Sequence, residues 1–101
     1  MKKYEYHVIP NTSIEFIFYP HDDPLIAVIY SVLNEIDVPM LNLDLIWRYE
    51  ELNKIENTKF GKIKIHKNLW GDIIIFAIEN EKIIDIIDQL LQKHQLFIKI
   101  D

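Results

Sequence analysis

The chain has 101 residues, half of them hydrophobic, with no cysteine and a formal net charge of −5 at pH 7. This length and composition predict one folded domain, residues 1–101, and they exclude disulfide bonds, thiolate metal sites and a cysteine nucleophile. The longest unbroken apolar runs, Leu25–Tyr30 and Ile73–Ile78, are far shorter than the roughly 20 residues that a membrane span needs, so we expect no membrane contact. Because small secreted domains often rely on disulfides, the absence of cysteine favours a cytoplasmic protein.

The N-terminal third has the pattern of a β-hairpin followed by a helix. Apolar and polar residues alternate over 3–9 and over 14–19, and the Pro-Asn-Thr-Ser segment between them is typical of a turn. Asp23 can cap a helix that begins with Pro24, because proline has no N–H to leave unpaired in the first turn. Apolar residues at helical spacing extend this helix to Ile36.

The remaining elements alternate between helix and strand patterns. A second helix is predicted over residues 42–56 and a half-exposed strand over 62–66. The apolar run at 73–78 is typical of a central strand, and a third helix over 80–93 begins at an asparagine, a good capping residue. Alternation over 96–100 predicts a last strand, so that the final three elements form a βαβ unit. The predicted order is ββααββαβ, an α+β fold with a mixed or antiparallel sheet and helices packed against it.

A binding patch is predicted on the second helix. The stripe that faces the core is complete without Leu43, Ile46 and Trp47, which project to the flank and far side beside Glu50. A tryptophan next to other apolar side chains can anchor a protein interface. The alternative, of equal weight, is that these side chains are buried within the fold or in a homodimer.

An acidic stripe is predicted on the third helix. Glu81, Asp85 and Asp88 follow one another at helical spacing, and this spacing places them opposite the isoleucines of the same helix. Such a stripe is usually a solvated face. It is also the geometry by which an acidic protein can occupy a basic groove of a partner.

A basic segment precedes the predicted central strand. It contains no carboxylate, has Phe60 and Trp70 near its ends, and includes Lys59, Lys62, Lys64, His66 and Lys67. Lysines beside aromatic rings can contact nucleic acid through phosphates and base stacking. Lysine also protects edge strands from aggregation, and the acidic net charge weighs against nucleic acid, so we keep nucleic-acid binding only as an alternative.

The close cluster of histidine and carboxylates, His21, Asp22 and Asp23, is predicted to be structural. Asp23 is accounted for by helix capping, and zinc sites usually need three or four ligands at recognisable spacing. The chain has no glycine-rich phosphate loop and no serine in a nucleophile-elbow motif. We therefore expect no catalytic residues, no metal and no cofactor.

The whole net charge of the chain lies in residues 1–50, which hold eight carboxylates against three basic residues. A small acidic chain with an exposed aromatic residue suits fast electrostatic capture of a basic partner protein. We therefore expect a non-enzymatic inhibitor, of the bacterial toxin immunity or antitoxin type, that binds and neutralises a toxic enzyme with a basic groove. A homo-oligomeric regulatory or small-ligand-binding module is the alternative.

Overall fold

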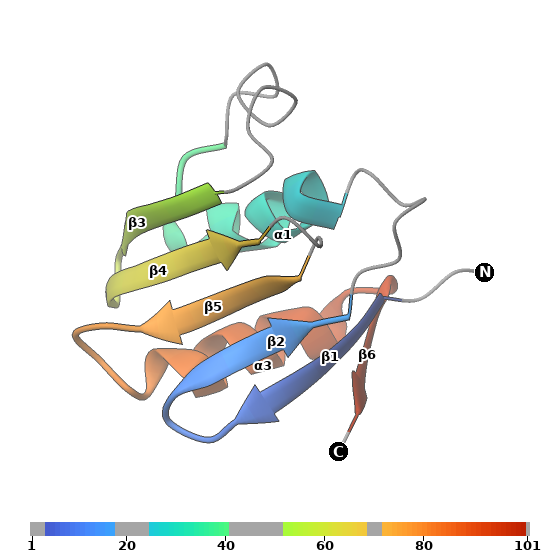
Figure 1. Ribbon diagram of the computed structural model, residues 1–101. Coiled ribbons are helices and arrows are strands. Elements are labelled where there is room, and N and C mark those ends of the chain that lie inside the picture. Colours follow the sequence, from blue (N-terminus) through green and yellow to red (C-terminus); the bar gives the residue numbers. More distant parts are fainter. Residues whose placement is uncertain (1–3, 18–24, 41–51, 69–71, 101) are drawn as a thin grey trace.

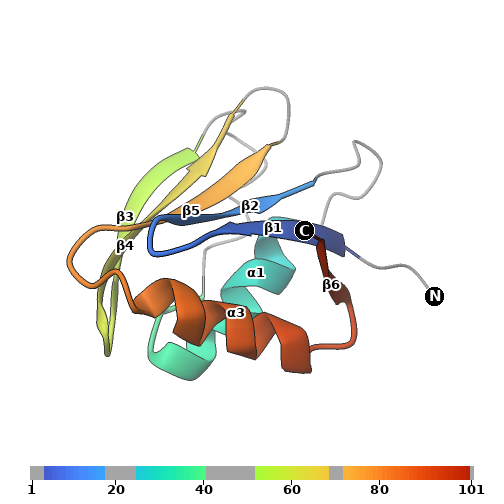
Figure 2. The same ribbon diagram turned by 90° about the horizontal axis from the view of Figure 1, so that it is seen from below.

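The computed structural model describes residues 4–17, 25–40, 52–68 and 72–100, and these form a six-stranded sheet with helices on one side (Figures 1 and 2). The sheet has the order β3-β4-β5-β2-β1-β6. Its strands are β1 (Tyr4–Ile9), β2 (Ser13–Phe16), β3 (Leu52–Thr58), β4 (Gly61–Lys67), β5 (Ile73–Ala77) and β6 (Phe97–Ile100). The helices are α1 (Leu25–Leu33), a short 3-10 helix (Asn34–Ile36) and α3 (Ile83–Lys93). The predicted α+β class is confirmed.

The sheet is mixed, because β6 pairs with β1 in parallel while every other neighbouring pair is antiparallel. These pairings make β5 and β6 parallel to each other, with β2 and β1 between them. Helix α3 makes the crossover, so the predicted βαβ unit is present. The N-terminal hairpin is also present, and Asn11 takes a left-handed conformation (φ 63°) in its turn, which asparagine tolerates better than most residues.

The core lies between the helices and the sheet face that they cover. It is built mainly from isoleucine, leucine and aromatic side chains. Two tyrosines, Tyr6 and Tyr30, are completely buried in it. Their hydroxyl groups need partners at that depth, and each finds a carboxylate, as described below.

The order of elements differs from the prediction between the first helix and β4. Residues 52–56, predicted to end a second helix, belong to β3, which pairs with β4 along its whole length from Leu52↔Lys67 to Thr58↔Gly61. The three-residue spacing of Leu52 and Ile55 resembles a helical stripe. The tight turn after Thr58 favours the hairpin instead, because Gly61 at its end can adopt a positive φ, here 127°. Residues 42–51 lie outside the described residues.

The predicted central position of residues 73–78 is confirmed by β5, which lies between β4 and β2. We expect the backbone amides of Ile73–Ala77 to be among the slowest to exchange with solvent, because strands flank β5 on both sides and Ile73 and Ile75 are fully buried. Hydrogen–deuterium exchange followed by NMR tests this directly. Exchange in β5 as fast as in the outermost strands would contradict it.

Candidate functional site

The sheet face turned away from α1 and α3 is the main candidate site, and we call it the open face (Figure 2). Strand register defines its side chains, because residues opposite each other on paired strands point to the same side. One row across the sheet consists of Ile55, Lys64, Phe76, Ser13 and Ile9. The next row consists of Asn53, His66, Ile74, Glu15 and His7.

Large apolar side chains are exposed across the open face. Ile55 is 58% exposed, Ile9 and Ile17 are each 38% exposed, and Ile98 on β6 is 44% exposed. Ile74 and Phe76 of β5 are half-buried between them. One exposed isoleucine has no special meaning, but a group of them on one face is typical of a surface that contacts another molecule.

Charges of opposite sign lie on the two halves of the open face. The β4 half carries Lys62, Lys64 and His66, whereas the β1 and β2 half carries Glu5 and Glu15. The apolar side chains of β5 separate the two halves. The Lys64 ammonium lies 6.0 Å from the centre of the Phe76 ring, so part of the basic half packs on this apolar centre.

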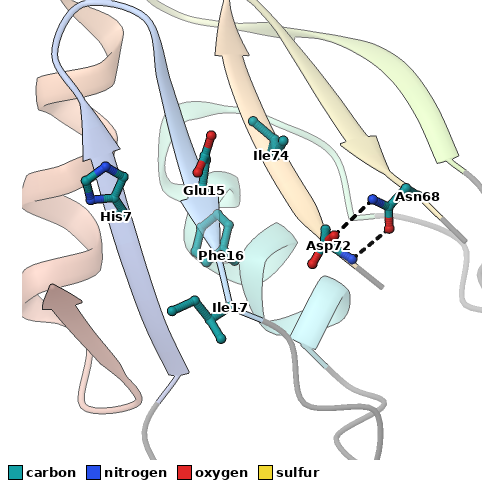
Figure 3. Close-up of a pocket in the computed structure, with 7 residues that line it drawn as sticks. All are labelled: His7, Glu15, Phe16, Ile17, Asn68, Asp72 and Ile74. Carbon is teal, nitrogen blue, oxygen red and sulfur yellow. Dashed lines mark hydrogen bonds between the residues drawn. The ribbon is translucent and has the colours of Figure 1, made fainter. Parts of the chain in front are cut away.

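A hollow of about 410 Å³ opens at the acidic end of this face (Figure 3). Its lining includes His7 and Glu15, which face each other across β1 and β2, and the apolar side chains of Ile17 and Ile74. Asn68 and Asp72 form the opposite wall and bond to each other: the Asn68 amide donates to Asp72 Oδ2 (3.0 Å), and the Asp72 N–H donates to Asn68 Oδ1 (2.9 Å). The hollow can therefore receive a side chain that presents a hydrogen-bond donor or a positive charge.

The acidic stripe predicted on α3 is only partly on the surface. Glu81 and Asp85 are exposed near the start of the helix and remain candidate partner contacts. Asp88 is buried under the sheet, so the expectation that it projects outward is wrong. Asp88 accepts a hydrogen bond from the Tyr6 hydroxyl (2.7 Å) and forms an ion pair with the Lys99 ammonium (2.8 Å).

The environment of Asp88 favours its ionised form. Burial by itself opposes ionisation, but hydrogen bonds from Lys99, Tyr6 and Gln92 outweigh it and hold the pKa of Asp88 below its usual value. Burial and the same carboxylate raise the pKa of Tyr6. Asp88 therefore joins helix α3 to strands β1 and β6, which is a structural role.

The predicted basic strand does not form a single basic surface. Lys62, Lys64 and His66 lie on the open face, but Lys67 pairs with Ile73, a core residue, and so points to the helix-covered side. The turn that carries Lys59 packs against the segment before α3, where the Asn80 amide donates to the carbonyl oxygen of Phe60 (3.1 Å). Gly61 of the same turn lies close to Asn80 and Glu79, so a carboxylate adjoins this end of the basic segment.

Several residues singled out in the sequence lie outside the described residues. They are Leu43, Ile46, Trp47, Glu50, Trp70 and the His21-Asp22-Asp23 cluster. Their proposed roles stay predictions. The open face itself was not predicted from the sequence, although isoleucines at outward positions of several strands were a signal for it.

No group of three histidine, aspartate or glutamate side chains suited to a metal ion occurs in the part of the chain that the structure describes. Among residues 4–17, 25–40, 52–68 and 72–100, no helix is long and apolar enough to span a membrane. Comparison with protein-family models, with curated proteins and with solved structures finds no match to this chain.

Proposed function

We propose that this chain is a protein-binding domain that neutralises another protein by stoichiometric binding, and that the open face is its contact surface. The observation that carries this proposal is the group of exposed isoleucines on the open face, 38–58% exposed, around the half-buried side chains of β5. Exposed apolar side chains mixed with charged ones on a single face are a common composition of a protein interface.

A protein partner fits the charges of the open face better than nucleic acid does. Lys62, Lys64 and His66 could contact phosphates, but Glu5 and Glu15 on the same face would repel them. A protein surface can offer both signs of charge within one interface. The class of partner that we favour is a toxic enzyme, as expected for an immunity or antitoxin-type inhibitor, because the chain has a net charge of −5 and can attract a basic protein over a long range.

We expect Phe76→Ala to weaken binding of the partner by about 2 kcal/mol, or roughly 30-fold, because aromatic side chains near the centre of an interface contribute most of the affinity. The partner to test is the protein encoded by the neighbouring gene. Binding is measured by titration calorimetry, and inhibition is measured with the activity of that protein.

Met40→Ala is the matched control, because Met40 is a large apolar residue, 53% exposed, that lies on no strand of the sheet. It is expected to change the affinity by less than about 0.5 kcal/mol. Circular dichroism establishes that both variants are folded. Equal affinities of the wild-type protein and the Phe76→Ala variant would show that the open face is not the contact surface, and Trp47→Ala would then test the second predicted patch.

The hollow beside Glu15 favours a second candidate function, binding of a small cationic ligand. His7 and Glu15 approach it from one side and apolar side chains form part of its wall. The two polar groups of the other wall are already bonded to each other, so few groups remain to orient a free ligand. A basic side chain of a protein partner, held by the rest of the open face, needs fewer such groups and is the occupant that we favour.

A further inference from the structure

Strand β3 is the outermost strand on one side of the sheet in the part of the chain that the structure describes. Its outer backbone groups can be identified from its neighbours. The carbonyl oxygen of Lys62 accepts a hydrogen bond from the N–H of Ile78 (3.1 Å), so the backbone of Lys62 points toward β5 and away from β3. Asn57 lies opposite Lys62, and residues directly opposite in an antiparallel pair point either both toward each other or both away.

The backbone N–H and C=O groups of Asn57 therefore point to the outer edge. Because this direction alternates along a strand, those of Ile55 and Asn53 point there as well. All three residues are exposed. The outer edge of β3 thus presents three donors and three acceptors in the spacing that another antiparallel strand requires.

The sequence around Ile55 is self-complementary. It is Asn-Lys-Ile-Glu-Asn over residues 53–57, with one asparagine at each end and one charge of each sign beside the isoleucine. In an antiparallel pair of two such strands centred on Ile55, Lys54 lies opposite Glu56 of the other strand. Each Asn53 lies opposite an Asn57, and the two Ile55 side chains lie side by side.

We propose that a second copy of this chain binds along β3, with its own β3 antiparallel and a twofold axis at Ile55. Asn53, Ile55 and Asn57 of each copy then hydrogen-bond to the other copy. Lys54 gains Glu56 of the other copy as a cross-strand partner in addition to the Glu56 of its own chain, whose Oε2 is 3.3 Å away.

Charge complementarity identifies a second copy as the occupant. Charged side chains on an edge strand normally prevent uncontrolled pairing with other strands, and a neutral strand would leave the buried Glu56 without a new opposite charge. A matching antiparallel strand must place a glutamate opposite Lys54 and a lysine opposite Glu56. A second copy of β3 does so, because the antiparallel direction brings its Glu56 to Lys54 and its Lys54 to Glu56. The same geometry gives no match on β6, where Lys99 is bound to Asp88 and would face Phe97 in a pair centred on Ile98.

This dimer would join two sheets into one and leave both open faces on the same side, since an axis normal to the sheet keeps the sides of the two copies the same. Each dimer would then present two copies of the surface proposed above to bind a partner. The dimer itself does not depend on that function. A variant such as Phe76→Ala, which alters only the open face, is expected to dimerise normally.

Single cysteines test the pairing, because the chain has none of its own. In the proposed dimer the two residues at position 55 have Cα atoms about 5.5 Å apart, within the range of a disulfide, so Ile55→Cys is expected to form a covalent dimer on mild oxidation. The two residues at position 57 are roughly 14 Å apart, so Asn57→Cys is expected to crosslink at least about tenfold more slowly. A mixture of Asn53→Cys and Asn57→Cys is expected to crosslink as a heterodimer. Equal rates for Ile55→Cys and Asn57→Cys would overturn the proposal.

Sedimentation velocity gives an independent readout without cysteines. The wild-type protein is expected to move from the 12.1 kDa protomer toward twice that mass as its concentration rises. Ile55→Pro removes an outward N–H that the fold does not use, which an edge strand tolerates, and it is expected to stay folded and monomeric. Ile55→Thr keeps the N–H and is expected to dimerise. A folded Ile55→Pro variant that dimerises like the wild-type protein would also overturn the proposal.

Discussion

Replacing Asp88 with alanine is expected to lower the free energy of unfolding by about 1–3 kcal/mol at pH 7. The change removes the short hydrogen bond of the buried Tyr6 hydroxyl (2.7 Å) and leaves it only the long contact with the carbonyl oxygen of residue 88 (3.5 Å), which costs about 1–3 kcal/mol. It also removes the ion pair with Lys99, whose side chain is 38% exposed and can turn to water, so this loss adds little. Urea denaturation at one fixed protein concentration measures the difference.

Asp88→Asn removes the charge of this residue and keeps its shape. Asparagine retains an acceptor for Tyr6 but loses the charge that attracts Lys99, so we expect a smaller loss, of about 1–2 kcal/mol. The pKa of Asp88 is lowered in the folded protein, so its ionised form stabilises the fold above the unfolded pKa of about 3.9 and this contribution is lost as the pH falls through the folded value. The difference between the wild-type protein and Asp88→Asn should therefore shrink in acid.

Asp85→Asn is the control for this pair of variants, because Asp85 lies on the same helix but is exposed. It lies in the first turn, where a negative charge interacts favourably with the helix dipole, and its loss is expected to cost no more than about 0.5 kcal/mol. An Asp88→Ala variant as stable as Asp85→Asn would show that the buried contacts of Asp88 do not stabilise the fold.

The burial of Asp88 could not be predicted from the sequence. Asp88 follows Ile84 by four residues and precedes Leu91 by three, and both of these are buried, so helical spacing places Asp88 at the edge of the buried stripe. Whether a carboxylate can occupy that edge depends on donors from elsewhere in the chain. Tyr6 and Lys99 supply them, and they lie on neighbouring strands that only the parallel pairing of β1 and β6 brings together.

Local patterns were sufficient where they agreed with tertiary structure. The hairpin, the central strand β5 and helix α3 follow from alternation, from the apolar run and from one-sided spacing. The start predicted for this helix, with Asn80 as its cap, is wrong: α3 begins at Ile83, and its N-cap residue, Lys82, makes no side-chain cap hydrogen bond. The Asn80 side chain instead accepts the N–H of Lys82 (3.1 Å) in the turn before the helix. At Leu52–Thr58 the local pattern was ambiguous, and pairing with β4 decided it. The open face required the register of several strands, which no single segment of sequence contains.

The second buried carboxylate, Glu56, lies on the same helix-covered face but at the opposite edge of the sheet, on β3, and depends on Tyr30. The Tyr30 hydroxyl donates to Glu56 Oε2 (2.6 Å), and both residues are buried. Lys54 also approaches Glu56, but its side chain is 46% exposed and contributes little. Tyr30→Phe keeps the ring and removes only the donor, so the buried carboxylate loses its main hydrogen bond. We expect a loss of about 1.5–3 kcal/mol at pH 7, the usual range for a hydrogen bond to a charged group.

The sign of this effect can be checked in alkaline solution and by a second substitution. Burial, and then the Glu56 carboxylate, raise the pKa of Tyr30, so its contribution is complete below the unfolded tyrosine pKa of about 10 and is lost as the pH rises above it. The advantage of the wild-type protein over Tyr30→Phe should therefore shrink above about pH 10. Tyr30→Phe combined with Glu56→Met removes both polar groups and is expected to be more stable than Tyr30→Phe alone, because no buried carboxylate is left without its donor. Glu56→Met alone is measured as the reference. If Glu56→Met lowers the stability of the Tyr30→Phe variant by as much as it lowers that of the wild-type protein, the two groups are not coupled, and the hydrogen bond does not stabilise the fold.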